Sequence, residues 1–170
     1  MPYTRMLKST KQSTRIIGID PGIERTGIGV IDVSGPQTSL VCVDCITTPK
    51  NHTQQQRLLE LKTAFQKILK KFSPDLASVE KLFFSANVKT AMHVSEARGI
   101  ILSELESAHI PTTEWTPQQI KQRVTGYGKA DKRQIQKLVC AILNLQVVPK
   151  PDDATDALAI ALAAQYKKEI

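Results

Sequence analysis

Several features are scarce in this sequence, and each shortage excludes a class of protein. No apolar run approaches the length of a membrane span, and residues 1–14 lack the apolar core of a secretory signal peptide. Three cysteines, an odd number, make neither a disulfide framework nor a four-ligand zinc site, and the three histidines share no zinc-type spacing. We therefore expect a cytoplasmic protein without a membrane partner, whose cysteines stay reduced and buried.

Acidic residues are also fewer than basic ones. The chain has 16 Asp and Glu against 23 Lys and Arg, a formal net charge of +7 and a pI near 9.4. Such a balance favours an acidic partner, and nucleic acid is the first candidate. Because 170 residues fit one domain with a sizeable core, we expect residues 15–170 to form that domain and residues 1–14 to be a disordered basic tail.

The stretch from Arg15 to Val33 predicts a β-hairpin. It places Asp20 at the end of a β-branched run, turns through Pro21-Gly22 and enters a second such run. A buried carboxylate needs hydrogen bonds, a counter-charge or a metal. We expect no lysine or arginine of this run to serve as that counter-charge. Taken alone, Asp20 is more typical of an ordinary turn residue.

The remaining pattern predicts an α/β domain in which three more strands alternate with helices. Apolar residues at spacings of three and four indicate helices, and short β-branched runs bounded by Pro or Gly indicate strands. The expected elements are strands at 40–48, 75–80 and 111–115, and helices at 54–72, 89–108, 116–124, 129–143 and from 152 onward.

Four acids in this pattern form a candidate site. Asp20 and Glu80 each end a predicted strand, whereas Asp153 and Asp156 lie one turn apart on the last predicted helix. Capping of that helix by its first acids is an equally good explanation of the pair in isolation. If the helix packs on the sheet through its alanines, all four carboxylates meet and need cations. All-oxygen ligands favour Mg²⁺ or Mn²⁺, and two such ions can clamp a phosphodiester.

Four motifs resemble the RuvC family of Holliday junction resolvases. They are G-I-D-P-G at 18–22 with T-G at 26–27, V-E-K-L-F-F at 79–84, A-R-G at 97–99, and D-D-A-T-D-A-L-A-I-A at 152–161. The resemblance implies a ribonuclease H-like fold with a central mixed five-stranded sheet flanked by helices. It implies a Mg²⁺-dependent homodimer, with two ions per subunit and Mn²⁺ as a substitute, that nicks opposed strands of a four-way DNA junction. A branch-migration motor complex is a further possible partner.

The resemblance also implies roles for individual residues. The catalytic and metal-binding acids fall on Asp20, Glu80, Asp153 and Asp156. Asp152 departs from the family pattern, and we assign Asp153 because it keeps the three-residue step to Asp156. The aromatic that wedges into the junction falls on Phe83. The expected DNA-binding residues lie in the basic segment 121–137, and they are Lys121, Lys129, Lys132 and Arg133.

Three other functions share parts of this pattern. Sugar kinases and actin-like ATPases open with a similar I-x-G-I-D-x-G, but they need two such domains around a cleft. A RuvC-like nuclease that trims ribosomal RNA precursors is closer, although the basic segment and the F-F after Glu80 favour the junction enzyme. A non-catalytic DNA-binding module is the third, and it would not need four acids.

Overall fold

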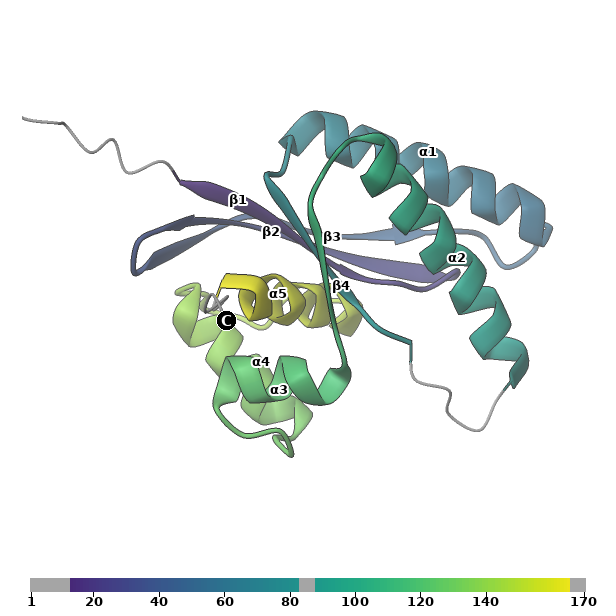
Figure 1. Cartoon of the computed structure of the whole chain (residues 1–170). Helices are drawn as coiled ribbons and strands as arrows, with labels where there is room; N and C mark the ends of the chain where they lie inside the picture. The colour runs from purple at the N-terminus through teal and green to yellow at the C-terminus, as the bar shows by residue number, and fades with distance from the viewer. Residues whose placement is uncertain (1–12, 83–87, 166–170) are drawn as a thin grey trace, which may run out of the picture.

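A five-stranded sheet lies between two layers of helices (Figure 1). The computed structural model describes residues 13–82 and 88–165. The strand order is β3-β2-β1-β4-β5, with β1, β2 and β3 antiparallel and β4 and β5 parallel to β1. The strands are β1 (Thr14–Asp20), β2 (Arg25–Ser34), β3 (Gln37–Thr47), β4 (Leu76–Glu80) and β5 (Thr112–Trp115). The predicted mixed five-stranded sheet is therefore confirmed.

The predicted hairpin is the centre of this sheet. β1 pairs with β2 so that Asp20 stands opposite Gly27. The hydroxyl of Thr26, which is fully buried, donates a hydrogen bond of 2.5 Å to the carbonyl oxygen of Gly22. This contact closes the turn after Asp20, because it ties the start of β2 back to the Pro-Gly corner. Asp20 is thereby held at the C-terminal end of the central strand β1 rather than on a loose loop.

The two helix layers bury different faces of the same strands. The helices α1 (Gln54–Phe72) and α2 (Val88–Ser107) cover one face, where Ile17 and Ile19 point. The helices α3 (Pro117–Thr125), α4 (Lys132–Ile142) and α5 (Asp152–Gln165) cover the other face, where Ile16 points. Successive strand residues face opposite ways, so the apolar run of β1 supplies both cores.

The helix α5 is packed directly onto the sheet. Ten of its residues are buried, most of them alanines. A Cβ on Gly18, Gly27 or Gly29 would collide with the α5 backbone, so these glycines let the helix approach the strands closely. Because small residues face each other on both elements, the first turn of α5 is brought to the edge where β1 ends.

The element boundaries follow local capping. Thr116 caps α3 as predicted, and its side chain accepts a hydrogen bond from the backbone of Gln119. The predicted helix 129–143 was wrong at its start: α4 begins at Lys132, because Asp131 forms a capping box with Gln134. Lys129 therefore precedes the helix.

Two smaller expectations also have outcomes in the fold. Cys42, Cys45 and Cys140 are free, as predicted, but each is only partly buried. Cys42 and Cys45 lie on β3, which is shielded on fewer sides than the inner strands. Within the described residues, no helix is long and apolar enough to cross a bilayer.

Candidate active site

The four predicted acids meet at one edge of the sheet. β1 and β4 are parallel neighbours with Ile19 beside Val79, so the next residues, Asp20 and Glu80, end the two strands side by side. Asp153 and Asp156 come from the first turns of α5, which packs on β1 and β2. The negative charges of Glu80, Asp153 and Asp156 all act on Asp20, so the four acids share one region of the fold.

The crowding of these carboxylates changes their acidity. Burial, the negative charges of Glu80 and Asp156 and a hydrogen bond with Glu80 raise the pKa of Asp20 to about 8. Burial also raises the pKa of Glu80, although the hydrogen bond with Asp20 and the charge of Lys121 act in the opposite direction. Asp20 and Glu80 can share a proton, as neighbouring carboxyl groups do when no cation separates them.

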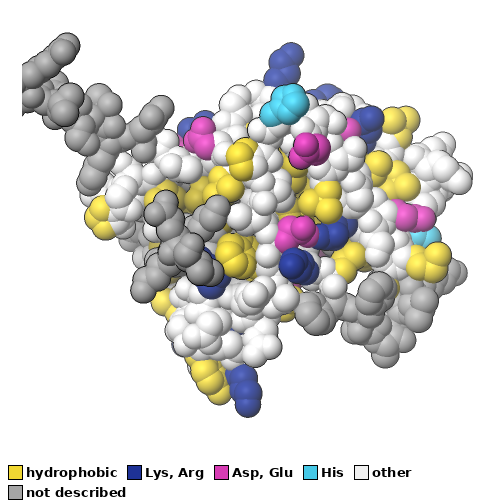
Figure 2. Space-filling model, in the orientation of Figure 1, with side chains coloured by type: hydrophobic (Ala, Val, Ile, Leu, Met, Phe, Trp, Pro, Cys, Tyr) yellow, Lys and Arg dark blue, Asp and Glu magenta, His cyan; other side chains and the backbone are white. Residues whose placement is uncertain are grey.

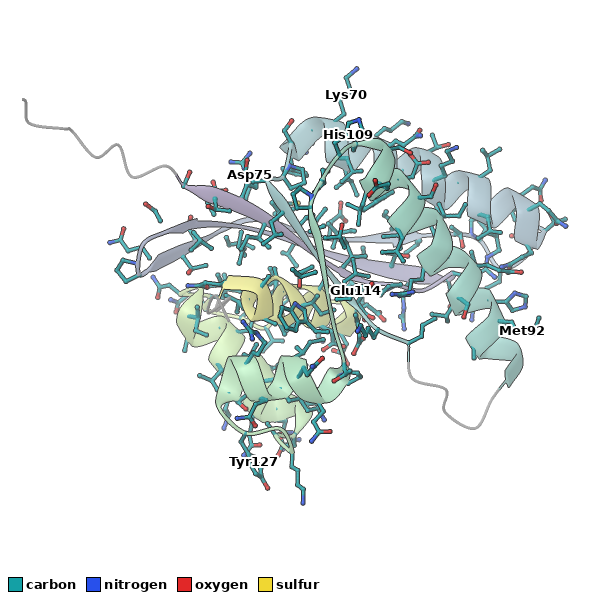
Figure 3. All side chains as sticks on the ribbon, in the orientation of Figure 1. Lys70, Asp75, Met92, His109, Glu114 and Tyr127 are labelled. Atoms are coloured by element: carbon teal, nitrogen blue, oxygen red, sulfur yellow. The ribbon has the colours of Figure 1, made fainter. Side chains whose placement is uncertain are left out.

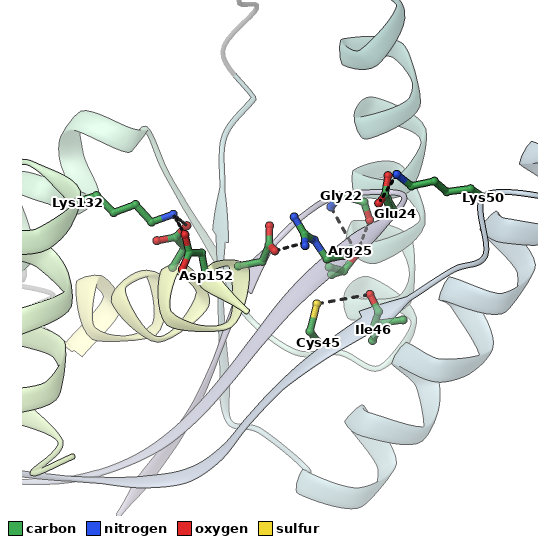
Figure 4. Close-up of polar contacts among 11 residues, drawn as sticks. Gly22, Glu24, Arg25, Cys45, Ile46, Lys50, Lys132 and Asp152 are labelled. Atoms are coloured by element: carbon green, nitrogen blue, oxygen red, sulfur yellow. Dashed lines mark hydrogen bonds and ion pairs between the residues drawn. The ribbon is translucent and has the colours of Figure 1, made fainter. Parts of the chain in front are cut away.

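Basic side chains accompany the two acids of α5 (Figure 4). Arg25 Nε lies 2.9 Å from Asp153 Oδ2, and Lys132 Nζ lies 3.3 Å from Asp156 Oδ2. Arg25 belongs to the first run, but its partner is Asp153 and not Asp20, and no basic group is among the causes of the raised pKa of Asp20. Arg25 reaches Asp153 because β2 starts beside the end of β1, where α5 also begins.

Asp152 has a different environment from the acids beside it. Its side chain is 61% exposed, and its Oδ2 lies 3.0 Å from Lys132 Nζ. Asp152 thus forms an ion pair with a lysine of α4. Lys132 consequently bridges Asp152 and Asp156.

A cleft of about 230 Å³ opens beside the acids. Two predicted acids, Glu80 and Asp156, line it together with two predicted DNA-binding residues, Lys121 and Lys132. The apolar part of the wall is formed by Pro117, Ile120, Ile135, Ala159 and Ile160. Carboxylates and ammonium groups therefore face one hollow of a size that a phosphate group and its surroundings can enter.

The other basic residues of segment 121–137 have different places. Lys129 and Arg133 are exposed and do not line this cleft. Arg123 turns inward: its guanidinium lies 4.3 Å from the centre of the Trp115 ring, and its Nε donates to the carbonyl oxygen of Ala163 at 2.7 Å. Arg123 thus joins α3 to β5 and α5.

Arg98 of α2 supports the strand end that carries Glu80. Its Nε donates to the carbonyl oxygen of Glu80 at 3.4 Å, and its guanidinium pairs with Glu114 on β5. Figure 3 labels Glu114 near the centre of the view, and Figure 2 shows acidic and basic side chains adjacent in the same region of the surface. In the sequence, Arg98 was noted only as part of the A-R-G motif, and no structural role was predicted for it.

The acids have the ligand atoms that a divalent cation prefers, but their side chains are not arranged in a preformed coordination shell. Their oxygens are the ligands that hard cations prefer. Among the described residues, the buried Asp153 Oδ2 has the ion-pair contact with Arg25 but no hydrogen-bond partner of standard geometry. In the described part of the chain, however, no three His, Cys, Asp or Glu are gathered tightly enough to hold a metal. Arg25, Lys132 and the Asp20–Glu80 contact engage the carboxylates instead.

Phe83, the predicted junction wedge, lies outside the described residues.

Comparisons with known proteins identify the family. A model of the crossover junction endodeoxyribonuclease RuvC family matches residues 16–164. The chain is 49% identical over 149 residues to the Thermotoga maritima RuvC, covering 88% of this chain and 89% of the relative. It is 48% identical over 152 residues to that of Chloroflexus aggregans, covering 89% of this chain and 93% of the relative.

Solved structures agree with this assignment. The Thermus thermophilus RuvC in complex with a Holliday junction substrate matches with a TM-score of 0.85 and 31% identity, covering 90% of this chain and 93% of that chain. A yeast mitochondrial Holliday junction resolvase, at 15% identity and a TM-score of 0.64 over 88% of this chain and 78% of that chain, shares the fold. The fold is ribonuclease H-like, as the resemblance implied. The chain belongs to the RuvC family of crossover junction endodeoxyribonucleases.

Proposed function

We propose that this protein is a structure-selective endonuclease that resolves four-way DNA junctions by paired nicks. The observation that carries the proposal is the meeting of Asp20, Glu80, Asp153 and Asp156 beside a cleft that Lys121 and Lys132 also line. Family membership supports the reaction class, and the T. thermophilus relative is described in complex with a Holliday junction substrate. Such a nuclease acts in homologous recombination and DNA repair.

The four acids are the catalytic and metal-binding residues of this proposal. They would hold Mg²⁺, two ions per subunit, with Mn²⁺ as a substitute. When bound, the metal supplies a polarised phosphate and an activated water for hydrolysis. The chain contributes the placement of the acids: β1 and β4 orient Asp20 and Glu80, and α5 orients Asp153 and Asp156. Arg98 steadies the end of β4 through the Glu80 carbonyl.

The basic residues would bind the DNA backbone. Lys121 and Lys132 line the cleft and can contact the phosphates next to the cleaved bond. Lys129 and Arg133 are exposed on the same α3–α4 side and can follow the strand further out. Phe83, three residues beyond Glu80, would stack on an unpaired base at the junction centre. Phosphate contacts give affinity, whereas the stacking aromatic favours a branched substrate.

The proposed active species is a homodimer. A four-way junction has two-fold symmetry, so two matched nicks call for two active sites related in the same way. A branch-migration motor complex would be a partner that moves the crossover to the cleavage position. Cytoplasmic location follows from the access to DNA that this reaction requires.

A cleavage comparison tests the proposed function. Labelled four-way junction, linear duplex and structured RNA are incubated with the protein in Mg²⁺. We expect paired symmetric nicks in the junction, no cleavage of the duplex and none of the RNA. Preferred cleavage of the RNA would favour a ribosomal RNA processing nuclease, and junction binding without any cleavage would favour a non-catalytic DNA-binding module.

Variants connect that activity to the acids. Asp20→Asn, Glu80→Gln, Asp153→Asn and Asp156→Asn keep side-chain shape and each remove a charge. We expect each to abolish cleavage while junction binding in gel-shift titrations stays intact or tightens, because a carboxylate repels a phosphate in the absence of metal. Double variants should be little less active than single ones, since the acids act as one unit.

A further inference from the structure

The contact between Arg25 and Asp153 has an unusual form. The guanidinium reaches from the start of β2 to the first turn of α5 (Figure 4), and the side chain of Arg25 is 52% exposed. Nε approaches Asp153 Oδ2 to 2.9 Å, yet that buried oxygen has no hydrogen-bond partner of standard geometry within the described residues. Arg25 therefore neutralises the charge of Asp153 without forming a well-aligned hydrogen bond to this oxygen.

The fold does not need this ion pair to place α5. Gly27 lies beneath the backbone of Asp153 so closely that a Cβ would collide with its carbonyl oxygen. Beyond it, the buried residues 157–164 of α5 pack on the sheet. A half-exposed ion pair adds little to stability in comparison. Arg25 is thus free to have a role other than anchoring the helix.

The charge balance of the site suggests that role. Four carboxylates lie at the ends of β1 and β4 and at the start of α5, so a cation placed among them is strongly favoured. Arg25 already offers one positive charge to Asp153, one of the four acids. A divalent cation bound to the same carboxylate would meet the guanidinium at short range, and like charges repel.

We propose that Arg25 competes with the divalent metal for Asp153 and thereby lowers the affinity of the DNA-free enzyme for metal. The inference rests on the proposed function, because it takes Asp153 as a metal ligand. In the metal-free protein, Arg25 neutralises Asp153. DNA phosphates offer Arg25 another anionic partner, so substrate binding releases Asp153 for the metal. Metal and junction DNA then strengthen each other's binding.

Mn²⁺ binding to the DNA-free protein tests this competition. Free Mn²⁺ is measured by electron paramagnetic resonance during titration of the wild type, Arg25→Gln, Arg25→Lys and Lys50→Gln. Lys50 is the matched control, because its Nζ pairs with Glu24 at 3.0 Å and is not paired with any of the four acids. We expect Arg25→Gln to bind Mn²⁺ on the order of tenfold more tightly, and the other two variants to stay within about twofold of wild type. Thermal unfolding without metal verifies that each variant is folded, and Arg25→Ala provides a second charge-removing change.

A second readout follows the metal requirement of cleavage. At saturating junction, the Mg²⁺ concentration that gives half-maximal cleavage should differ little among wild type, Arg25→Gln and Lys50→Gln, because bound DNA already holds Arg25 away from Asp153. Unchanged Mn²⁺ affinity in both charge-removing variants would overturn the inference, and weaker affinity would show that Arg25 positions Asp153 instead. Asp20→Asn distinguishes failure of this inference from failure of the proposed function. If Asp20→Asn binds Mn²⁺ as tightly as wild type, the proposed metal site itself is wrong.

Discussion

Gly27 on β2 lies directly under the backbone of Asp153, and a Cβ at this glycine would collide with the carbonyl oxygen of Asp153. One strand residue without a side chain therefore sets how closely the first turn of α5 approaches the sheet. Gly27 also stands opposite Asp20 in the β1–β2 ladder. The same position thus brings two of the proposed metal ligands, Asp20 and Asp153, to one edge.

Gly27→Ala should destabilise the protein and displace Asp153. Overpacking of this kind costs about 1–3 kcal/mol, measured as the free energy of unfolding in urea. Cleavage should fall by more than the smaller folded fraction explains, because the helix carrying two acids is pushed outward. Gly99→Ala is the control: nothing lies within 4 Å of a Cβ there, so α2 should tolerate alanine or become more stable by up to about 1 kcal/mol. Equal unfolding energies for the two variants would contradict the prediction.

Asp152→Asn should retain near-normal junction cleavage. Asp152 is the more exposed of the two partners of Lys132, and Asp156 remains to hold the lysine when the charge on Asp152 is removed. The matched change Asp153→Asn should abolish cleavage. Initial rates on the same labelled junction distinguish the two. An inactive Asp152→Asn beside an active Asp153→Asn would mean that Asp152 is the ligand, although a metal-dependent nuclease would still be the best proposal.

Lys121→Ala and Lys132→Ala should each weaken junction binding and flatten its dependence on salt. Removing one ammonium–phosphate interaction should reduce the log–log slope by about one unit. Lys67, an exposed lysine on α1 in the opposite helix layer, is the control, and its replacement by alanine should leave the slope unchanged. Binding is followed by fluorescence anisotropy in a salt series. Identical slopes in all three variants would show that Lys121 and Lys132 do not contact DNA phosphates and are ordinary surface residues.

The metal-free protein should become less stable as the pH rises from about 4 to 8. The pKa of Asp20 is about 8 in the folded state, and its ordinary value is 3.8. Between these values the folded state holds a proton that the unfolded state releases, so the free energy of unfolding falls with rising pH. The raised pKa values of Glu80 and Asp156 act in the same direction.

Asp20→Asn removes the largest part of this pH dependence. Melting temperatures of the metal-free wild type in a buffer series should drop toward pH 8, while those of Asp20→Asn should change less and lie higher at pH 8. A wild-type melting temperature that rises over this range would contradict the assignment of a shared proton to Asp20 and Glu80. Cleavage in Mg²⁺ should increase toward pH 8, because the metal needs the ionised carboxylate.

The protein should be a dimer through α2. Met92 on this helix is 61% exposed and projects away from the body of the molecule (Figure 3). Met92→Glu should shift the mass in light scattering from dimer toward monomer and impair paired nicking. Leu59→Glu is the control, because Leu59 is 64% exposed on α1 and lies outside the proposed interface. A wild type that stays monomeric at micromolar concentration, with and without junction DNA, would rule out this arrangement.

Local patterns in the sequence were sufficient to predict most elements of this fold. The hairpin around Pro21-Gly22 and the cap at Thr116 depend on interactions within a few residues, so they can be read directly from the chain. The start of α4 was missed by three residues, although the Asp131–Gln134 capping box is an equally local signal. The positions of the four acids came from their motifs and from the resemblance to a family, and their convergence was an inference from strand ends and an alanine-rich helix.

Only the tertiary structure decided which basic side chain meets which acid. Arg25 and Asp153 are far apart in the sequence and meet because β2 and α5 begin at the same edge. Arg123, in a basic segment, turns inward onto Trp115, whereas Lys121 two residues earlier lines the cleft. Helical periodicity assigns residues to faces, but the neighbour that each face meets depends on how distant elements pack. The fold class could therefore be predicted from the sequence, whereas the pairing of charges in the site required the packed sheet and helices.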